Sequence, residues 1–189
     1  MKSRFNLIQA AASVLIAMGL SLPALADTKT NDNLAAQQKG VELINQVGDV
    51  ALDIRYNAEH LDSFNKRMQI SERSHTYHLN QIKALVNDGL NPALAQLEDL
   101  QAQLPDWKQQ TIDSMLDSAK ALAADANSAI LERNESHTAS PAMNPEYKAL
   151  VKQVEGHAQN LIETSDAAAA YASSQLKAQE AGISVPSQS

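Results

Sequence analysis

Apolar side chains recur every three or four residues along four long segments of this 189-residue chain. That spacing places them on one face of an α-helix, and the strict alternation typical of a half-buried β-strand is nowhere sustained. Residues that favour helices, such as Ala, Leu, Gln, Glu and Lys, dominate these segments, while glycine and proline are rare inside them. The pattern therefore predicts an all-α protein.

The boundaries of the pattern predict helices over residues 32–69, 72–103, 106–134 and 145–181. The first two connections are very short, which forces neighbouring helices to lie antiparallel. Asn144 before Pro145 is typical of a helix start, because the asparagine side chain caps backbone N–H groups that would otherwise lack a partner. We expect an elongated antiparallel four-helix bundle of up-down-up-down order and coiled-coil-like spacing. It would form one domain over residues 27–182, followed by a disordered tail over residues 183–189.

Three small details bear on how these helices pack. Gly89 and Pro92 interrupt the second helix, because a proline ring clashes with the carbonyl four residues earlier. The apolar pattern resumes in phase after them, which favours a kinked helix, and a full break into two helices stays open. Gly48 and Gly156 are candidates for close contacts between helices, and Ser165 is the one polar residue in the apolar stripe of the last helix.

The first 26 residues have the features of a secretory signal peptide. Lys2 and Arg4 precede a short apolar run, and Pro23 is followed by the small-x-small pattern Ala24-Leu25-Ala26. The apolar run is shorter than the roughly 20 residues that a membrane-spanning helix needs. We therefore expect cleavage after Ala26, a periplasmic or secreted protein, and no membrane span in the mature chain.

Composition excludes several classes of function. Removing Lys2 and Arg4 with the signal peptide leaves 13 basic against 22 acidic residues, a net charge of −9, and such an acidic chain repels nucleic acid. The chain has no cysteine, which excludes disulfides and thiolate ligands. It also lacks the Gly-x-Ser-x-Gly elbow and the glycine-rich phosphate loops of common enzymes. We therefore expect neither an enzyme nor a bound cofactor.

The start of the second helix carries the one candidate metal site. Glu72, His75 and His78 follow one another at steps of three, which places them on the same helical face, and His60 on the preceding helix is a potential fourth ligand. A closed zinc site needs four ligands, so two histidines and a glutamate that simply cover a solvated helix end are the simpler interpretation.

The segment over residues 74–89 reads SHTYHLNQIKALVNDG. It resembles a segment of uncharacterised exported α-helical proteins of Gram-negative bacteria, in which a histidine, an Ile-Lys pair and a Val-Asn pair precede a glycine on one helix. The likeness is clearest over residues 74–135. The resemblance implies a helical fold and export, and it implies no activity.

These observations lead to one main hypothesis and two alternatives. The main hypothesis is an exported, non-catalytic binding or scaffold protein that acts through its helical surfaces on a protein partner or on a second copy of itself. The first alternative is a periplasmic metal-binding protein that uses Glu72, His75, His78 and His60. The second is a carrier that holds a small apolar ligand between its helices.

Overall fold

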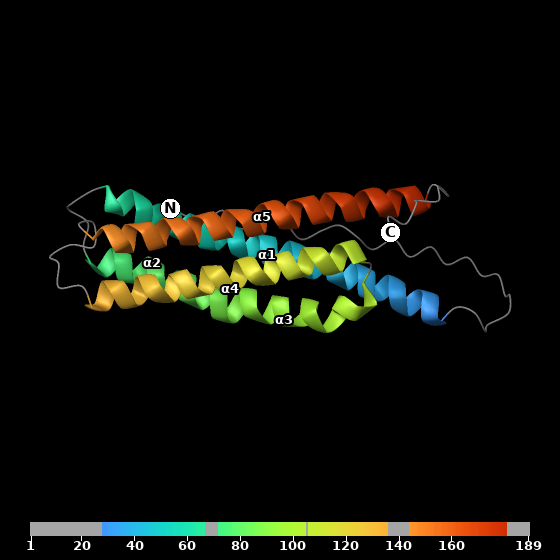
Figure 1. The fold of residues 1–189 in the computed structure, drawn as a ribbon. Helices are drawn as coiled ribbons and strands as arrows, with labels where there is room; N and C mark the ends of the chain where they lie inside the picture. The colour runs from blue at the N-terminus through green and yellow to red at the C-terminus, as the bar shows by residue number, and fades with distance from the viewer. Residues whose placement is uncertain (1–27, 67–71, 105, 136–143, 181–189) are drawn as a thin grey trace, which may run out of the picture.

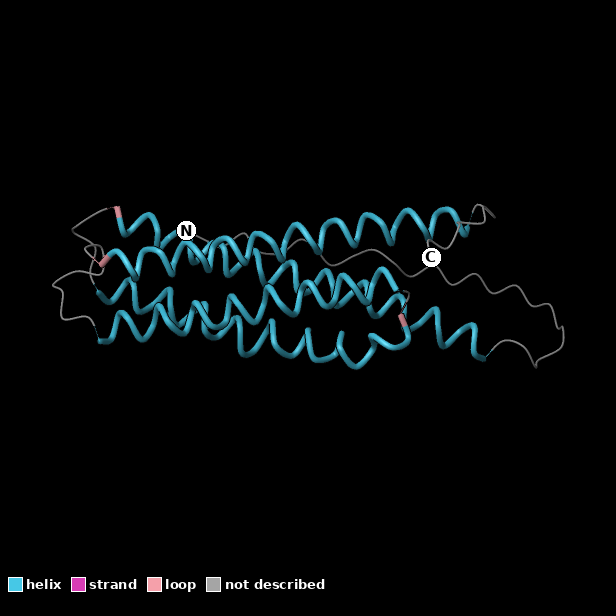
Figure 2. The backbone as a smooth tube through the Cα atoms, in the orientation of Figure 1, coloured by secondary structure: helices cyan, strands magenta, loops and turns pink. Residues whose placement is uncertain are grey.

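The protein is described by a computed structural model that covers residues 28–66, 72–104, 106–135 and 144–180. Within these ranges the backbone is helical apart from the residues at helix ends, and it contains no strand (Figure 2). The predicted all-α class is therefore confirmed. The predicted signal peptide and the predicted tail over residues 183–189 lie outside the described residues.

The helices follow the apolar pattern of the sequence closely. Helix α1 covers Thr28–Asn65, α4 covers Asp106–Glu135 and α5 covers Pro145–Glu180. Between α1 and α4, one helical run consists of α2 (Glu72–Ala84), a π-helical turn η1 (Leu85–Leu90), α3 (Asn91–Leu100) and a 3₁₀ turn η2 (Gln101–Gln103).

The π turn shows what happens at Gly89 and Pro92. The backbone N–H of Asn91 bonds to the carbonyl of Val86, five residues earlier, and α3 follows directly. Pro92 has no N–H to donate and its ring would clash with a carbonyl four residues back, so the wider π turn accommodates it without breaking the helix. A Cβ atom at Gly89 would lie 3.1 Å from both γ-methyl groups of Val50, so the glycine lets the turn lie close against α1.

The helices lie lengthwise beside one another (Figure 1). Helix α5 packs against α1 and α4, and the run from α2 to α3 packs against the same two helices. In Figure 1, α1 and α4 run in one direction, whereas the α2–α3 run and α5 run in the other. The end of the molecule where α1 leads to α2, and α4 leads to α5, is called the hairpin end below.

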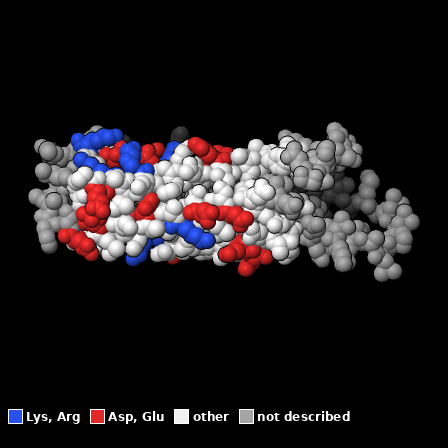
Figure 3. Space-filling model, in the orientation of Figure 1, with Lys and Arg blue, Asp and Glu red and all other residues white. Residues whose placement is uncertain are grey.

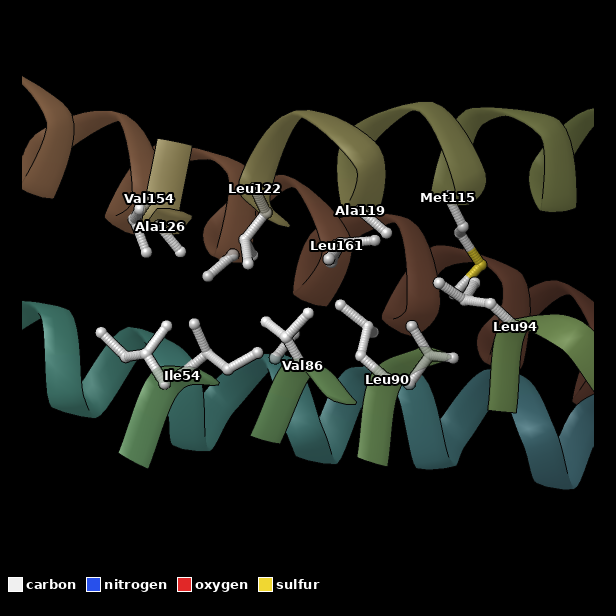
Figure 4. Close-up of a cluster of buried hydrophobic side chains, with 14 of the residues drawn as sticks. Ile54, Val86, Leu90, Leu94, Met115, Ala119, Leu122, Ala126, Val154 and Leu161 are labelled. Carbon is white, nitrogen blue, oxygen red and sulfur yellow. The ribbon is translucent and has the colours of Figure 1, made fainter. Parts of the chain in front are cut away.

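The core lies between the helices along the length of the molecule. Figure 4 shows Ile54, Leu90, Leu122 and Leu161 pointing toward one another from different helices, and each of them is fully buried. Burying one such side chain stabilises the fold by about 1.5–3 kcal/mol relative to leaving it in water. The core is therefore continuous and aliphatic through the middle of the molecule.

Helices α1 and α5 lie close together at Gly48. A Cβ atom there would lie 2.9 Å from the Cβ atom of Ser165, so only glycine fits at this crossing. The Ser165 hydroxyl is buried and has no hydrogen-bond partner among the described residues. The expected close contact at Gly48 is therefore present. By contrast, a Cβ atom at Gly156 would meet nothing within 4 Å, so the close contact expected there is absent.

No helix in the described part of the chain is long and apolar enough to cross a membrane.

On the face in view in Figure 3, acidic and basic side chains are interspersed, and the full chain has a net charge of −7. Several of these charges link helices: Lys152 on α5 lies 3.2 Å from the Asp62 carboxylate on α1. Hydrogen bonds from Lys66 and Lys152 outweigh the opposite effect of burial and lower the pKa of Asp62.

Candidate functional site: a cluster of aromatic and histidine rings

The hairpin end holds a cluster of rings that is set in place by the first turn of α5. The Asn144 side-chain oxygen accepts hydrogen bonds from the backbone N–H groups of Glu146 and Tyr147, at 2.9 and 3.1 Å. Its side-chain nitrogen donates to Glu132 on α4, at 2.6 Å. Asn144 therefore caps α5, as the sequence predicts, and also ties the start of α5 to the end of α4. The cap fixes the position of Tyr147.

Tyr147 is fully buried and meets His75 of α2. The Tyr147 hydroxyl lies 3.1 Å from His75 Nδ1, and His75 is also fully buried. The other ring nitrogen of His75 has no hydrogen-bond partner among the described residues. Burial, with the nearby charges of Arg133 and His78, lowers the pKa of His75 to about 4, and burial raises the pKa of Tyr147. Both rings are therefore neutral at pH 7, and neither can be reached by a molecule in solution.

Above this buried pair, His60 of α1 and His78 of α2 stack on each other. Their ring centroids are 5.0 Å apart and their planes differ by 12°. His78 Nδ1 lies 2.8 Å from the side-chain oxygen of Asn57, which fixes the orientation of that ring. Burial and the neighbouring His60 lower the pKa of His78. Phe64 contacts both rings from below, with centroids 6.0 Å from His60 and 5.4 Å from His78.

Two tyrosines extend the stack to the surface. Tyr56 packs edge-on against His60 with centroids 4.5 Å apart, and Tyr77 packs edge-on against His78 at 5.1 Å. Both tyrosines are 59% exposed, the highest exposure among the large hydrophobic residues described. We call these four residues (Tyr56, His60, Tyr77 and His78) the ring surface. Leu52, one turn before Tyr56 on α1, is also 48% exposed and extends the apolar area.

The structure separates the residues of the predicted metal site. His75 is buried against Tyr147, and the Glu72 carboxylate lies 3.9 Å from the Arg133 guanidinium of α4. Of the four predicted ligands, only His60 and His78 lie side by side. Each imidazole lone pair lies in the plane of its ring, so the nitrogens of two stacked rings do not point toward one shared metal ion. Among the described residues, no three His, Cys, Asp or Glu side chains are grouped so that they could hold a metal ion.

Part of this cluster was visible in the sequence and part was not. Tyr56, His60 and Phe64 follow one another at steps of four, and this spacing alone places three rings on one face of a helix. As a single residue, His60 is indicated by the sequence only as a candidate metal ligand. The contact between His75 and Tyr147 joins residues 72 positions apart, and no local pattern indicates it.

The comparisons with known proteins add no family to this description: no family model, no curated protein and no solved structure matches the chain.

Proposed function

We propose that this protein is an exported, non-catalytic binding protein, built as an elongated up-down-up-down four-helix bundle, that holds a partner protein at its ring surface. The observation that carries the proposal is the exposure of Tyr56 and Tyr77, each 59%, on either side of the stacked histidines. Tyrosine is enriched at protein interfaces, because its ring supplies apolar contact area and its hydroxyl a hydrogen bond.

The rings are held rigidly before any partner arrives. His78 is fixed by Asn57, and both histidines rest on Phe64. A surface that is already ordered loses little side-chain entropy on binding, so more of the contact energy appears as affinity. Below this layer, buried His75 packs against Phe64, and buried Tyr147 packs against His75.

The charge around the ring surface suggests the chemistry of the partner. The whole chain is acidic, and the exposed carboxylates of Glu59 and Glu72, which pair with Arg55 and Arg133, lie on the two helices that carry the rings. Tyrosine faces attract guanidinium and ammonium groups through cation–π contacts. We therefore propose a partner that presents a basic segment, with at least one Arg or Lys side chain placed over a tyrosine ring.

Site-specific photo-crosslinking tests this proposal. A photoreactive phenylalanine derivative replaces Tyr77 in one variant and Tyr171 in a matched control, in cells that produce the full chain. Tyr171 is 39% exposed on α5, and it lies about 36 Å along that helix from Tyr147. We expect discrete adducts from position 77 that disappear when Tyr56→Ser is added, and no such adducts from position 171. Equal crosslinking at the two positions, or none at position 77, contradicts the proposal.

Light scattering after size exclusion identifies a second copy of the chain as the partner if the particle contains more than one chain. In that case the double variant Tyr56→Ser/Tyr77→Ser should be monomeric. A monomeric wild-type protein directs the crosslinking experiment toward a different chain.

A second proposal is metal binding at the hairpin end, favoured by the adjacent rings of His60 and His78. Imidazole is the commonest side-chain ligand for zinc, copper and nickel, and one ring has to turn out of the stack for both to reach the same ion. Native mass spectrometry with Zn²⁺ or Cu²⁺ tests it. Unchanged metal binding in the His60→Gln/His78→Gln variant rules out this pair, and the same comparison with Glu72→Gln and with His75→Gln tests the other two predicted ligands.

A further inference from the structure

A cavity of about 130 Å³ lies where the π turn passes α4, away from the ring surface. Its apolar part is formed by Val86 from η1 and by Ala123, Ala126 and Ile130 from α4. Val86 and Ala126 are buried, and Figure 4 shows them on facing helices. An engineered cavity of about 150 Å³ in another protein holds a benzene ring, so this space suits an apolar group of about six carbons.

The rim of the cavity is polar. It is formed by Lys83, Asn87 and Asn91 from the α2–α3 run and by Asn127 from α4. All four are exposed, so the cavity opens to solvent on this side. Within the described part of the chain, none of these four side chains makes a hydrogen bond or an ion pair. The rim therefore presents one ammonium group and three side-chain amides that can form hydrogen bonds with a ligand.

Three of the rim residues lie on one side of the α2–α3 run. Lys83, Asn87 and Asn91 follow one another at steps of four, which places them on the same side of the run as it continues through the π turn. Gly89 lets the turn move toward Val50 of α1, and small residues on α4 (Ala123 and Ala126) leave the space opposite it unfilled. Such π turns are frequent at functional sites.

We propose that this cavity binds a small monocarboxylic acid with an apolar chain or ring of about six carbons. The carboxylate pairs with Lys83 and accepts hydrogen bonds from the asparagine amides, and the apolar part lies against Val86 and Ala126. A single ammonium group matches one negative charge, and none of the described residues that line the cavity carries a carboxylate that would repel it. This site is separate from the ring surface, and it is amphipathic rather than purely apolar.

The test uses hexanoate as the probe and hexanamide, its neutral analogue of equal size, as the matched control. Backbone amide signals are followed by two-dimensional NMR while each probe is added to the full protein. We expect saturable shifts at Val86, Asn87, Ala126 and Asn127, with a hexanoate Kd on the order of 1 mM. Hexanamide should bind about tenfold more weakly, because it cannot form the charged hydrogen bonds.

Three variants complete the test. Lys83→Gln should reduce hexanoate binding to the level of hexanamide. Ala123→Leu should abolish binding by filling the cavity, while Ala124→Leu, an exposed neighbour on the same helix that does not line the cavity, should leave it unchanged. Circular dichroism of each variant shows that the fold is retained.

Shifts that do not saturate, shifts that lie elsewhere on the protein, or equal binding of hexanoate and hexanamide would overturn the proposal. Tyr56→Ser/Tyr77→Ser should leave hexanoate binding unchanged, which separates the outcome of this test from that of the crosslinking experiment.

Discussion

In the middle of the molecule, Ile54, Leu90 and Leu122 face one another in a core of aliphatic side chains, whereas at the hairpin end the buried layer contains His75 and Tyr147. The middle depends on shape and on the removal of apolar surface from water, neither of which changes with pH. The hairpin end depends on ring contacts, on a few hydrogen bonds and on His75 remaining uncharged. The middle and the hairpin end of the same helices therefore respond differently to the same solution conditions.

This difference also separates the roles of the two regions. The aliphatic middle holds α1, α4, α5 and the α2–α3 run together, and the hairpin end uses that support to display Tyr56 and Tyr77. Rings that are exposed but fixed require a rigid layer beneath them.

Leu122→Ala should have the largest effect on stability. The side chain is fully buried, and removing it leaves a space that its neighbours cannot fill. We expect the free energy of unfolding to fall by about 2–5 kcal/mol, by nearly the same amount at pH 7.5 and at pH 5. Urea denaturation at the two pH values measures this. Leu131→Ala on the same helix is the control, because Leu131 is 49% exposed and its removal should cost less than about 0.5 kcal/mol.

Gly48→Ala tests the crossing of α1 and α5. The added methyl group meets the Ser165 Cβ atom at 2.9 Å, so the helices have to move apart, with an expected net loss of about 1–3 kcal/mol. Combining it with Ser165→Gly should restore part of the loss, which a double-mutant cycle would detect. Additive effects of the two substitutions would show that the contact does not limit the approach of the helices.

His75 should make the hairpin end sensitive to pH. Its pKa is about 4 in the folded protein and about 6.5 in the unfolded chain, so the unfolded chain binds more protons between these values. Stability is therefore complete above about pH 6.5 and falls as the pH drops toward 4. Between pH 7.5 and pH 5, we expect this one residue to reduce the free energy of unfolding by about 2 kcal/mol.

The measurement compares urea denaturation of the wild type and of His75→Phe across this pH range. The variant should lose about 2 kcal/mol less than the wild type, because phenylalanine does not titrate, and Leu122→Ala should keep the wild-type dependence. Parallel pH profiles for His75→Phe and the wild type would show that His75 is not responsible.

Gly156→Ala should have the smallest effect and the opposite sign. Nothing lies within 4 Å of the position where the new Cβ atom would be, so the substitution only removes the flexibility of a glycine within helix α5. We expect a gain of about 0.5–1 kcal/mol in the free energy of unfolding. Thermal unfolding of Gly156→Ala, measured beside Gly48→Ala, tests this expectation. A loss of stability in Gly156→Ala would contradict the open surroundings of this position.

Local pattern was sufficient for the helical class and for several individual features. Steps of three and four between apolar residues predict α-helix because one turn contains 3.6 residues, and the confirmed class follows from that geometry alone. The Asn144 cap was predictable for the same reason, since the capping oxygen and the N–H groups that it accepts lie within three residues of each other. Pro92 indicated a disturbed helix, and its geometry is local as well.

Features that join distant residues depended on the tertiary structure. Gly48 and Gly156 are equivalent in the sequence, and only the packing of α5 against α1 distinguishes the glycine that faces Ser165 from the one that faces open space. Similarly, three evenly spaced residues suggested a metal site, and packing placed His75 against Tyr147 and Glu72 beside Arg133. Helical spacing determines which side chains share a face of a helix, whereas the rotation and depth of each helix in the packed molecule determine what that face meets.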